Sequence, residues 1–194
     1  MRPYDIVWTT DGSAPASIIM ASLGTLPMNN ITIHQRHTCR RSLRCMFINI
    51  LCGLQQCEHD IVFICEHDVL YPRGYFDADL VTDAVTYSEW GVFLSAAGFR
   101  TRTRPALSSL AGDRKTLMRL FHGKLAEHYA NGKVGWCELT APDGLWHMRK
   151  ATAPYVDVRH GMNYTGGRDG GMTCQNVLEW GNAGKLWEKI GGGK

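Results

Sequence analysis

The chain has 194 residues, of which 44% are hydrophobic and 20% are charged, and its formal net charge at pH 7 is +3. This balance excludes a disordered or fibrous chain, and the length is enough to bury about 70% of the surface that the unfolded chain exposes. The apolar runs are far shorter than the ~20 residues that cross a bilayer, so no membrane span is expected. The chain opens without a secretory segment and its cysteines form no CxxC pair, which predicts a cytoplasmic protein with reduced thiols.

The first part of the chain alternates strand and helix patterns. Residues 6–8 predict a strand, and a helix is expected from about Ser13. Ile31 and Ile33 alternate with polar residues and predict a second strand. Residues 61–65 are continuously apolar, as in a central strand that is covered on both faces. The intervening apolar positions recur at spacings of three and four and predict a helix: Leu43, Met46, Phe47, Ile50, Leu51 and Leu54.

This order predicts an α/β fold with a mostly parallel central sheet flanked by helices, in a single domain over residues 1–190 with a flexible tail at 191–194. Further along we expect a strand at 91–97, a helix from about Arg114 to Tyr129 and a loop at 161–171. Ligands of such folds bind at the carboxyl ends of the strands. The polar residues after the first three strands are therefore expected to meet at one edge of the sheet.

Glu66 and Asp68 follow the predicted central strand and form the strongest chemical signal. Like charges this close repel in a partly desolvated place, and a divalent cation such as Mg²⁺ or Mn²⁺ relieves the repulsion. The alternative is a solvent-exposed acidic turn. Cys57-Glu58-His59-Asp60 repeats Cys65-Glu66-His67-Asp68, but eight extended residues span about 26 Å at about 3.3 Å each, so the two copies cannot share one ion. We assign the first copy to a surface connection.

The stretch from His37 through Asp77, which includes residues 61–72 and 75–77, resembles GT-A-fold glycosyltransferases of bacterial and phage type, whose Asp-X-Asp element often reads Glu-His-Asp. Residues 156–165 are similar to the C-terminal segment of the same proteins, whereas residues 79–153 match poorly. The resemblance implies a GT-A-like (Rossmann-like) fold and transfer of a hexose or pentose from a nucleotide sugar, with UDP-glucose or another UDP-sugar as donor. It also implies the cytoplasm of a bacterial or phage-infected cell.

The resemblance assigns roles to particular positions. Asp68 and His160 would hold the metal, and Glu66 would support either the metal or the ribose. The donor would contact Thr9, Thr10, Asp11, Arg36, Arg40, Arg41, Glu66 and His67. For His160 taken alone, the alternative is a hydrogen-bonded structural histidine, and for each arginine it is a solvated residue before a helix.

An inverting transfer also needs a carboxylate that accepts the proton of the acceptor hydroxyl. Asp113 is the first candidate because it directly precedes the predicted helix at Arg114, and Glu138 and Asp143 compete with it. Aspartate in that position is also a common helix N-cap. The sequence leaves open whether the reaction inverts or retains configuration, and therefore whether a base exists.

Arg100, Arg102 and Arg104 alternate along the chain, so an extended segment would present all three on one face, with Lys115 near in sequence. The pattern suits either a phosphate-contacting surface or a charged edge strand. With the phage-type resemblance it favours DNA as acceptor, at a hydroxymethylated pyrimidine such as 5-hydroxymethylcytosine, which would have to be flipped out of a duplex. The alternatives are a glycan, protein or metabolite acceptor, a non-catalytic nucleotide- or nucleic-acid-binding protein, and a metal-dependent nucleotidyltransferase or hydrolase.

Overall fold

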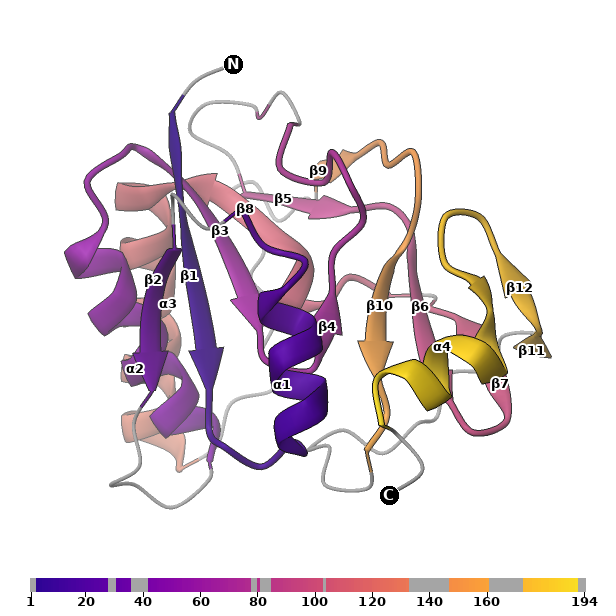
Figure 1. The fold of residues 1–194 in the computed structure, drawn as a ribbon. Coiled ribbons are helices and arrows are strands. Elements are labelled where there is room, and N and C mark those ends of the chain that lie inside the picture. The colour runs from indigo at the N-terminus through magenta and orange to yellow at the C-terminus, as the bar shows by residue number, and fades with distance from the viewer. Residues whose placement is uncertain are drawn as a thin grey trace.

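The structure, a computed structural model, describes residues 3–27, 31–35, 42–77, 80, 85–102, 104–132, 147–160 and 173–191. Two β-sheets stand side by side at its centre, and helices pack against them (Figure 1). The helices are α1 (Ala16–Leu23), α2 (Leu43–Gln56), α3 (Arg114–Asn131) and α4 (Ala183–Lys189), and a short 3₁₀ turn spans Leu107–Ser109. The expected mixed α/β class is confirmed.

The first sheet has six strands in the order β2-β1-β3-β8-β5-β9. Strands β1 and β2, β1 and β3, and β5 and β9 pair in parallel, whereas β8 is antiparallel to both of its neighbours. Because β8 runs against the other strands, this sheet is mixed, and the expected mostly parallel arrangement is confirmed only in part. Their bounds are β1 (Tyr4–Thr10), β2 (Ile31–Gln35), β3 (Ile61–Glu66), β5 (Val85–Ser88), β8 (Leu110–Asp113) and β9 (His147–Arg149).

A second sheet of five strands, in the order β11-β7-β6-β10-β4, was not predicted. Only its β6–β10 pair is parallel. Most of its strands have two to four residues, too few to show an alternating pattern in the sequence. They are β4 (Val69–Leu70), β6 (Gly91–Ser95), β7 (Gly98–Thr101), β10 (Tyr155–Val158) and β11 (Thr173–Cys174); β12 (Asn176–Val177) and β13 (Gly181–Asn182) form a separate pair.

The helices predicted at residues 43–54 and 114–129 are present in the structure as α2 and α3. Helix α2 buries Phe47, Ile50 and Leu54 on its apolar face, and the Ser42 side chain caps it by accepting from the Cys45 amide at 3.2 Å. Helix α3 ends at Gly132, whose φ of 68° is the left-handed conformation that glycine adopts without strain. Among the described residues, no helix combines the length and apolar character that a membrane crossing needs.

Strand β3 is buried on both faces, as its continuous apolar run predicted. Val62 and Ile64 pack with α2 and α3 on one face. Phe63 and Cys65 pack on the other against an aromatic group that contains Tyr71, Tyr75, Phe76 and Tyr155. The strand thus lies in the middle of the core, and only its last residue, Glu66, is partly exposed. The residues that follow it are held by the rigid centre of the protein.

The first copy of the Cys-Glu-His-Asp sequence is a structural connection, as predicted. Asp5 Oδ2 accepts hydrogen bonds from the amides of Glu58 and His59 at 2.8 and 2.7 Å, and its Oδ1 lies 2.9 Å from His59 Nδ1. Ile61 lies opposite Tyr4, so this contact is at the amino ends of β1 and β3. Burial raises the pKa of the Asp5 carboxyl, but the hydrogen bonds from His59 and Glu58 outweigh it and hold that pKa below its ordinary value of 3.8.

We expect Asp5→Ala to lower the free energy of unfolding by about 1–3 kcal/mol at pH 7, because two backbone amides lose their acceptor. Since the folded-state pKa is lowered, the stabilisation by the ionised carboxylate is present above about pH 4 and is lost as the pH falls through the folded value. Urea denaturation of wild type, Asp5→Ala and Asp5→Asn at pH 7 and at pH 3 tests this. Equal stability of wild type and Asp5→Ala at pH 7 would contradict it.

Candidate metal centre

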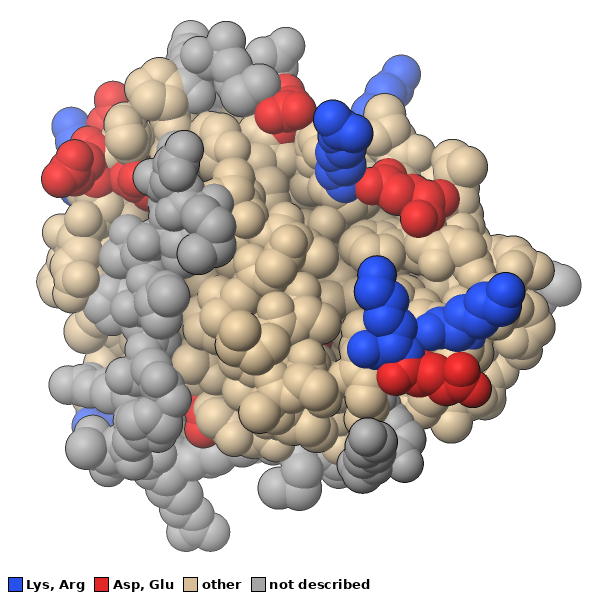
Figure 2. All heavy atoms as spheres, viewed as in Figure 1, with Lys and Arg blue, Asp and Glu red and all other residues tan. Residues whose placement is uncertain are grey.

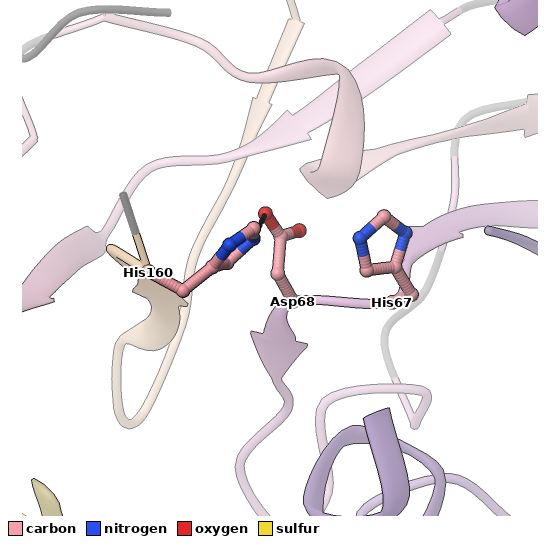
Figure 3. Close-up of side chains that lie close together, drawn as sticks. All are labelled: His67, Asp68 and His160. Carbon is pink, nitrogen blue, oxygen red and sulfur yellow. Dashed lines mark hydrogen bonds and ion pairs between the residues drawn. The ribbon is translucent and has the colours of Figure 1, made fainter. Parts of the chain in front are cut away.

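Three side chains that bind metals meet at the end of β3. One ligand atom of each of His67, Asp68 and His160 lies within 4.8 Å of those of the other two. Figure 3 shows the Asp68 carboxylate between the two imidazole rings, whose centroids are 6.2 Å apart. His160 Nε2 is 3.3 Å from Asp68 Oδ2, and the His160 side chain is only 1% exposed, whereas that of Asp68 is 15% exposed. The cluster is thus largely buried, with its carboxylate partly open to solvent.

Strand pairing brings these residues together although 92 positions separate Asp68 from His160. Strand β10 is antiparallel to β4, with Asp157 opposite Val69. One step further, the Val158 amide donates to the Asp68 carbonyl at 2.8 Å. His160 follows two residues after Val158 and therefore arrives beside the Asp68 side chain.

Two buried hydroxyl groups hold the turn between β3 and β4. Ser22 Oγ, on α1, donates to the Val69 carbonyl at 2.7 Å and accepts from Trp8 Nε1 at 3.2 Å. The Tyr71 hydroxyl accepts from the Glu66 amide at 3.1 Å and donates to the Ser108 carbonyl at 2.9 Å. The backbone on both sides of His67 and Asp68 is therefore fixed before any ligand binds.

The donor set fits a divalent transition metal. Two ligands about 2.1 Å from one cation stand about 3.0–3.4 Å apart at octahedral or tetrahedral angles, a range that contains the 3.3 Å between His160 and Asp68. Imidazole nitrogen suits Mn²⁺, Fe²⁺, Co²⁺ and Zn²⁺, whereas Mg²⁺ prefers an all-oxygen shell. Which of the two cations expected from the sequence binds here stays a prediction.

The group at the end of β3 contains His67 where the sequence suggested Glu66, so His67 joins the candidate ligands and the role of Glu66 stays a prediction. The prediction assumed an extended backbone, in which residues two apart share one face. The strand instead ends at Glu66, and His67 and Asp68 occupy a turn, where consecutive side chains can approach one point. His67, expected at the donor, is therefore a candidate metal ligand.

The end of β1 lies beside the same turn, because Thr9 stands opposite Glu66 in the parallel β1–β3 pair. Asp11 Oδ1 is 3.6 Å from His67 Nε2, so this carboxylate can orient the imidazole. The Thr9 hydroxyl donates to the Cys65 carbonyl at 3.3 Å, and the Thr10 hydroxyl accepts from the Gly12 amide at 3.0 Å. The two threonines thus shape the loop, and Asp11 is the residue of the three that contacts the metal group.

Asp113, the first candidate for a catalytic base, lies away from the metal group and caps a helix. It lies opposite Ile61, at the amino end of β3, five residues or about 16 Å of extended strand from Glu66. Its carboxylate accepts from the Thr116 amide at 2.9 Å and caps α3, so the helix-capping alternative is confirmed. Antiparallel β8 carries it away from the metal centre.

The other two base candidates, Glu138 and Asp143, lie outside the described residues, as do Arg36, Arg40 and Arg41.

Arg100, Arg102, Arg104 and Lys115 were expected to form one basic surface, but they do not lie together on one. Arg102 Nη1 bonds to Asp157 Oδ2 at 2.6 Å, and its guanidinium lies 4.8 Å from the Phe93 ring. Arg100 and Arg104 are exposed, and so is Lys115, but Lys115 belongs to α3, across the molecule from β7 (Figure 1). On the face in Figure 2 the basic and acidic side chains of the described residues lie next to each other rather than in a basic patch.

The ion pair of Arg102 belongs to a buried cluster that was not predicted. Asp157 also has Arg159 Nε at 3.7 Å, and Arg159 stacks on Phe93 at 3.9 Å. The pKa of Asp157 is raised to about 6, because burial and then the charge of Asp68 outweigh the lowering effects of Arg159 and Arg102. An aspartate between two valines of a strand was the signal in the sequence, because a charge in an apolar strand needs a partner.

The chain matches no model of a known protein family and no curated protein.

We expect apo protein to bind Mn²⁺ and Asp68→Asn or His160→Ala to weaken that binding by at least about 100-fold, because each removes a ligand. Asp60→Asn is the matched control, since Asp60 is the exposed aspartate of the repeated Cys-Glu-His-Asp sequence. Isothermal titration of EDTA-treated protein measures the affinities. If all variants bind alike, the contact between His160 and Asp68 is an ordinary hydrogen bond and no metal centre exists.

Ser22→Ala leaves Trp8 Nε1 and the Val69 carbonyl without their buried partner, so we expect a loss of about 1–3 kcal/mol in the free energy of unfolding. It also loosens the turn, and a 10–100-fold loss of Mn²⁺ affinity is expected, as for other groups that support metal ligands. Ser17→Ala, at an exposed position of the same helix, is the control. Unchanged Mn²⁺ affinity in Ser22→Ala would show that α1 does not position the site.

Proposed function

We propose that the chain is a metal-dependent glycosyltransferase of GT-A-like fold that transfers a sugar from a nucleoside diphosphate sugar to an acceptor hydroxyl. One observation carries the proposal. The Glu-His-Asp turn and the histidine of the C-terminal segment, the two elements of the resemblance, converge within 4.8 Å although they are far apart in sequence. The mixed α/β fold with its parallel β1, β2 and β3 agrees with the proposal.

The position of the cluster supports a nucleotide-sugar donor. The metal group follows β3 and lies beside the end of β1, at the carboxyl ends of two parallel strands, where nucleotides bind in α/β sheets. A divalent cation bound there stabilises the negative charge of a departing nucleoside diphosphate. Asp68, His67 and His160 hold it, Asp11 orients His67, and the loop after β1 borders the donor.

The acceptor is the less specific part of the proposal. Arg102 is committed to Asp157, so the arginine row gives DNA less support than the sequence suggested. A 5-hydroxymethylated pyrimidine stays the acceptor to test first because of the phage-type resemblance, followed by glycan, protein and metabolite hydroxyls. Asp113 lies beside the amino end of β3, away from the metal group, so no described carboxylate is assigned as the catalytic base.

We expect the protein with Mn²⁺ to release intact nucleoside diphosphate from a UDP-sugar and to add a hexose or pentose, detected by mass spectrometry, to one of a panel of acceptors that includes hydroxymethylated DNA. Asp68→Asn should lower the rate by about 10²–10³-fold, because charge stabilisation in the transition state is lost. Asp60→Asn should keep the wild-type rate.

Other outcomes point to other functions. Release of phosphate or sugar phosphate in place of nucleoside diphosphate would indicate a hydrolase or nucleotidyltransferase, for which a metal site also suffices. Nucleotide binding without turnover on any donor would indicate a non-catalytic binding protein. Full activity of Asp68→Asn would remove the metal centre from the mechanism.

A further inference from the structure

Helix α3 carries a row of basic residues on its exposed side. Lys115, Arg119 and His122 follow one another at spacings of four and three residues, so they share one face of the helix, and all three are exposed. Tyr129 continues this face about two turns further on and is 58% exposed. From Lys115 to Tyr129 this basic stripe covers about 21 Å at 1.5 Å per residue.

The excess positive charge of the chain is concentrated on the helix layer that contains the stripe. Helices α2 and α3 lie side by side on one face of the first sheet, where Phe47 packs against Phe121 (Figure 1). Together they carry five lysines and arginines and one glutamate, a formal charge of +4, whereas the whole chain has +3. That glutamate, Glu127, pairs with Lys124 at 3.5 Å, which is not part of the stripe.

Helix stability does not account for these cations. The first turn of a helix favours carboxylates because its free N–H groups carry partial positive charge, yet the first turn of α3 contains Arg114 and Lys115 and no acidic residue. Asp113 caps the helix but precedes it. Lys115 and Arg119 are like charges four residues apart, a pair that destabilises a helix. An anionic partner along this face would offset both effects.

The stripe ends at an aromatic group that suits a nucleic-acid base. The guanidinium of Arg44, from the first turn of α2, lies 4.7 Å from the centre of the Tyr129 ring, and Arg44 is exposed too. Aromatic rings and guanidinium planes both stack on unpaired bases, and proteins bind single strands by combining such stacking with cations along the backbone. An anionic membrane fits less well, because the apolar face of α3 lies in the core and cannot insert.

We propose that the exposed face of α3 binds a single-stranded nucleic acid, with phosphates along Lys115, Arg119 and His122 and a base stacked against Tyr129 and Arg44. The surface uses none of the candidate metal ligands, and binding requires neither a metal nor the proposed glycosyl transfer. Phosphate contacts and stacking do not read base edges, so little dependence on base sequence is expected.

The test measures binding of short fluorescein-labelled single-stranded DNA and RNA by anisotropy, in EDTA and at increasing NaCl. Lys115→Gln with Arg119→Gln should weaken binding at least about tenfold and lower the slope of log K against log[salt] by about 1.4, at about 0.7 per lost phosphate contact. Tyr129→Ala should weaken binding about tenfold with an unchanged slope, because stacking involves no charge. Lys185→Gln with Lys189→Gln, which removes two exposed lysines at the same spacing from α4, should bind as wild type does.

Thermal unfolding of each variant establishes that it is folded. The proposal is overturned if wild type binds neither single strand at low salt, or if the α4 pair loses as much affinity as the α3 pair, because binding then follows net charge alone. It is also overturned if a duplex of the same sequence binds more tightly and Tyr129→Ala has no effect. Binding of phosphatidylserine vesicles through Lys115 and Arg119, without binding of nucleic acid, would identify a membrane surface instead.

Discussion

The candidate site depends on the register of β10. Two strands fix it, since β10 pairs antiparallel with β4 on one side and parallel with β6 on the other. The bond from the Val158 amide to the Asp68 carbonyl is the last step of this pairing, and it sets where His160 emerges. A slip by one residue would turn every side chain of β10 to the opposite face, which would put Tyr155 and Asp157 in the places of Val156 and Val158 and take His160 from Asp68. The apolar residues that bury β10 thus also specify the metal group.

The exchange of Glu66 for His67 changes the electrostatics of the site. Two carboxylates and a neutral histidine would cancel the charge of a divalent cation, whereas one carboxylate and two neutral histidines leave a net charge of about +1. That excess charge lies at the ends of β1 and β3, and it is little screened, because two of the three ligand side chains are about nine-tenths buried or more. Under the proposed function, a site of this kind would attract a diphosphate more strongly than the version with two carboxylates that the sequence suggested.

Local patterns predicted the fold well where the elements are long. The spacing of Phe47, Ile50 and Leu54 gave α2, and the unbroken apolar run gave β3. The second sheet was missed because its short strands are defined by partners distant in sequence. The same limit applies to the site. A resemblance linked His160 to Asp68, but only the turn after Glu66 brings in His67, and only the antiparallel direction of β8 carries Asp113 away. Arg102 was misassigned because its partner, Asp157, lies 55 residues away.

Two largely buried arginines on neighbouring sheets show how the fold stabilises a positive charge away from water. Arg102 and Arg149 both stack on aromatic rings, and both have side chains largely withdrawn from water. Arg102 has Asp157 at 2.6 Å, so its charge is balanced within the chain. Arg149 Nη1 donates to the Tyr75 carbonyl at 3.0 Å. The fold therefore has the means to place a carboxylate against a buried guanidinium, and it does so on β10. On β9 the charge of Arg149 is instead stabilised by the Tyr75 carbonyl and by the faces of the Tyr75 and Phe63 rings, so aromatic stacking does for one arginine part of what a carboxylate does for the other.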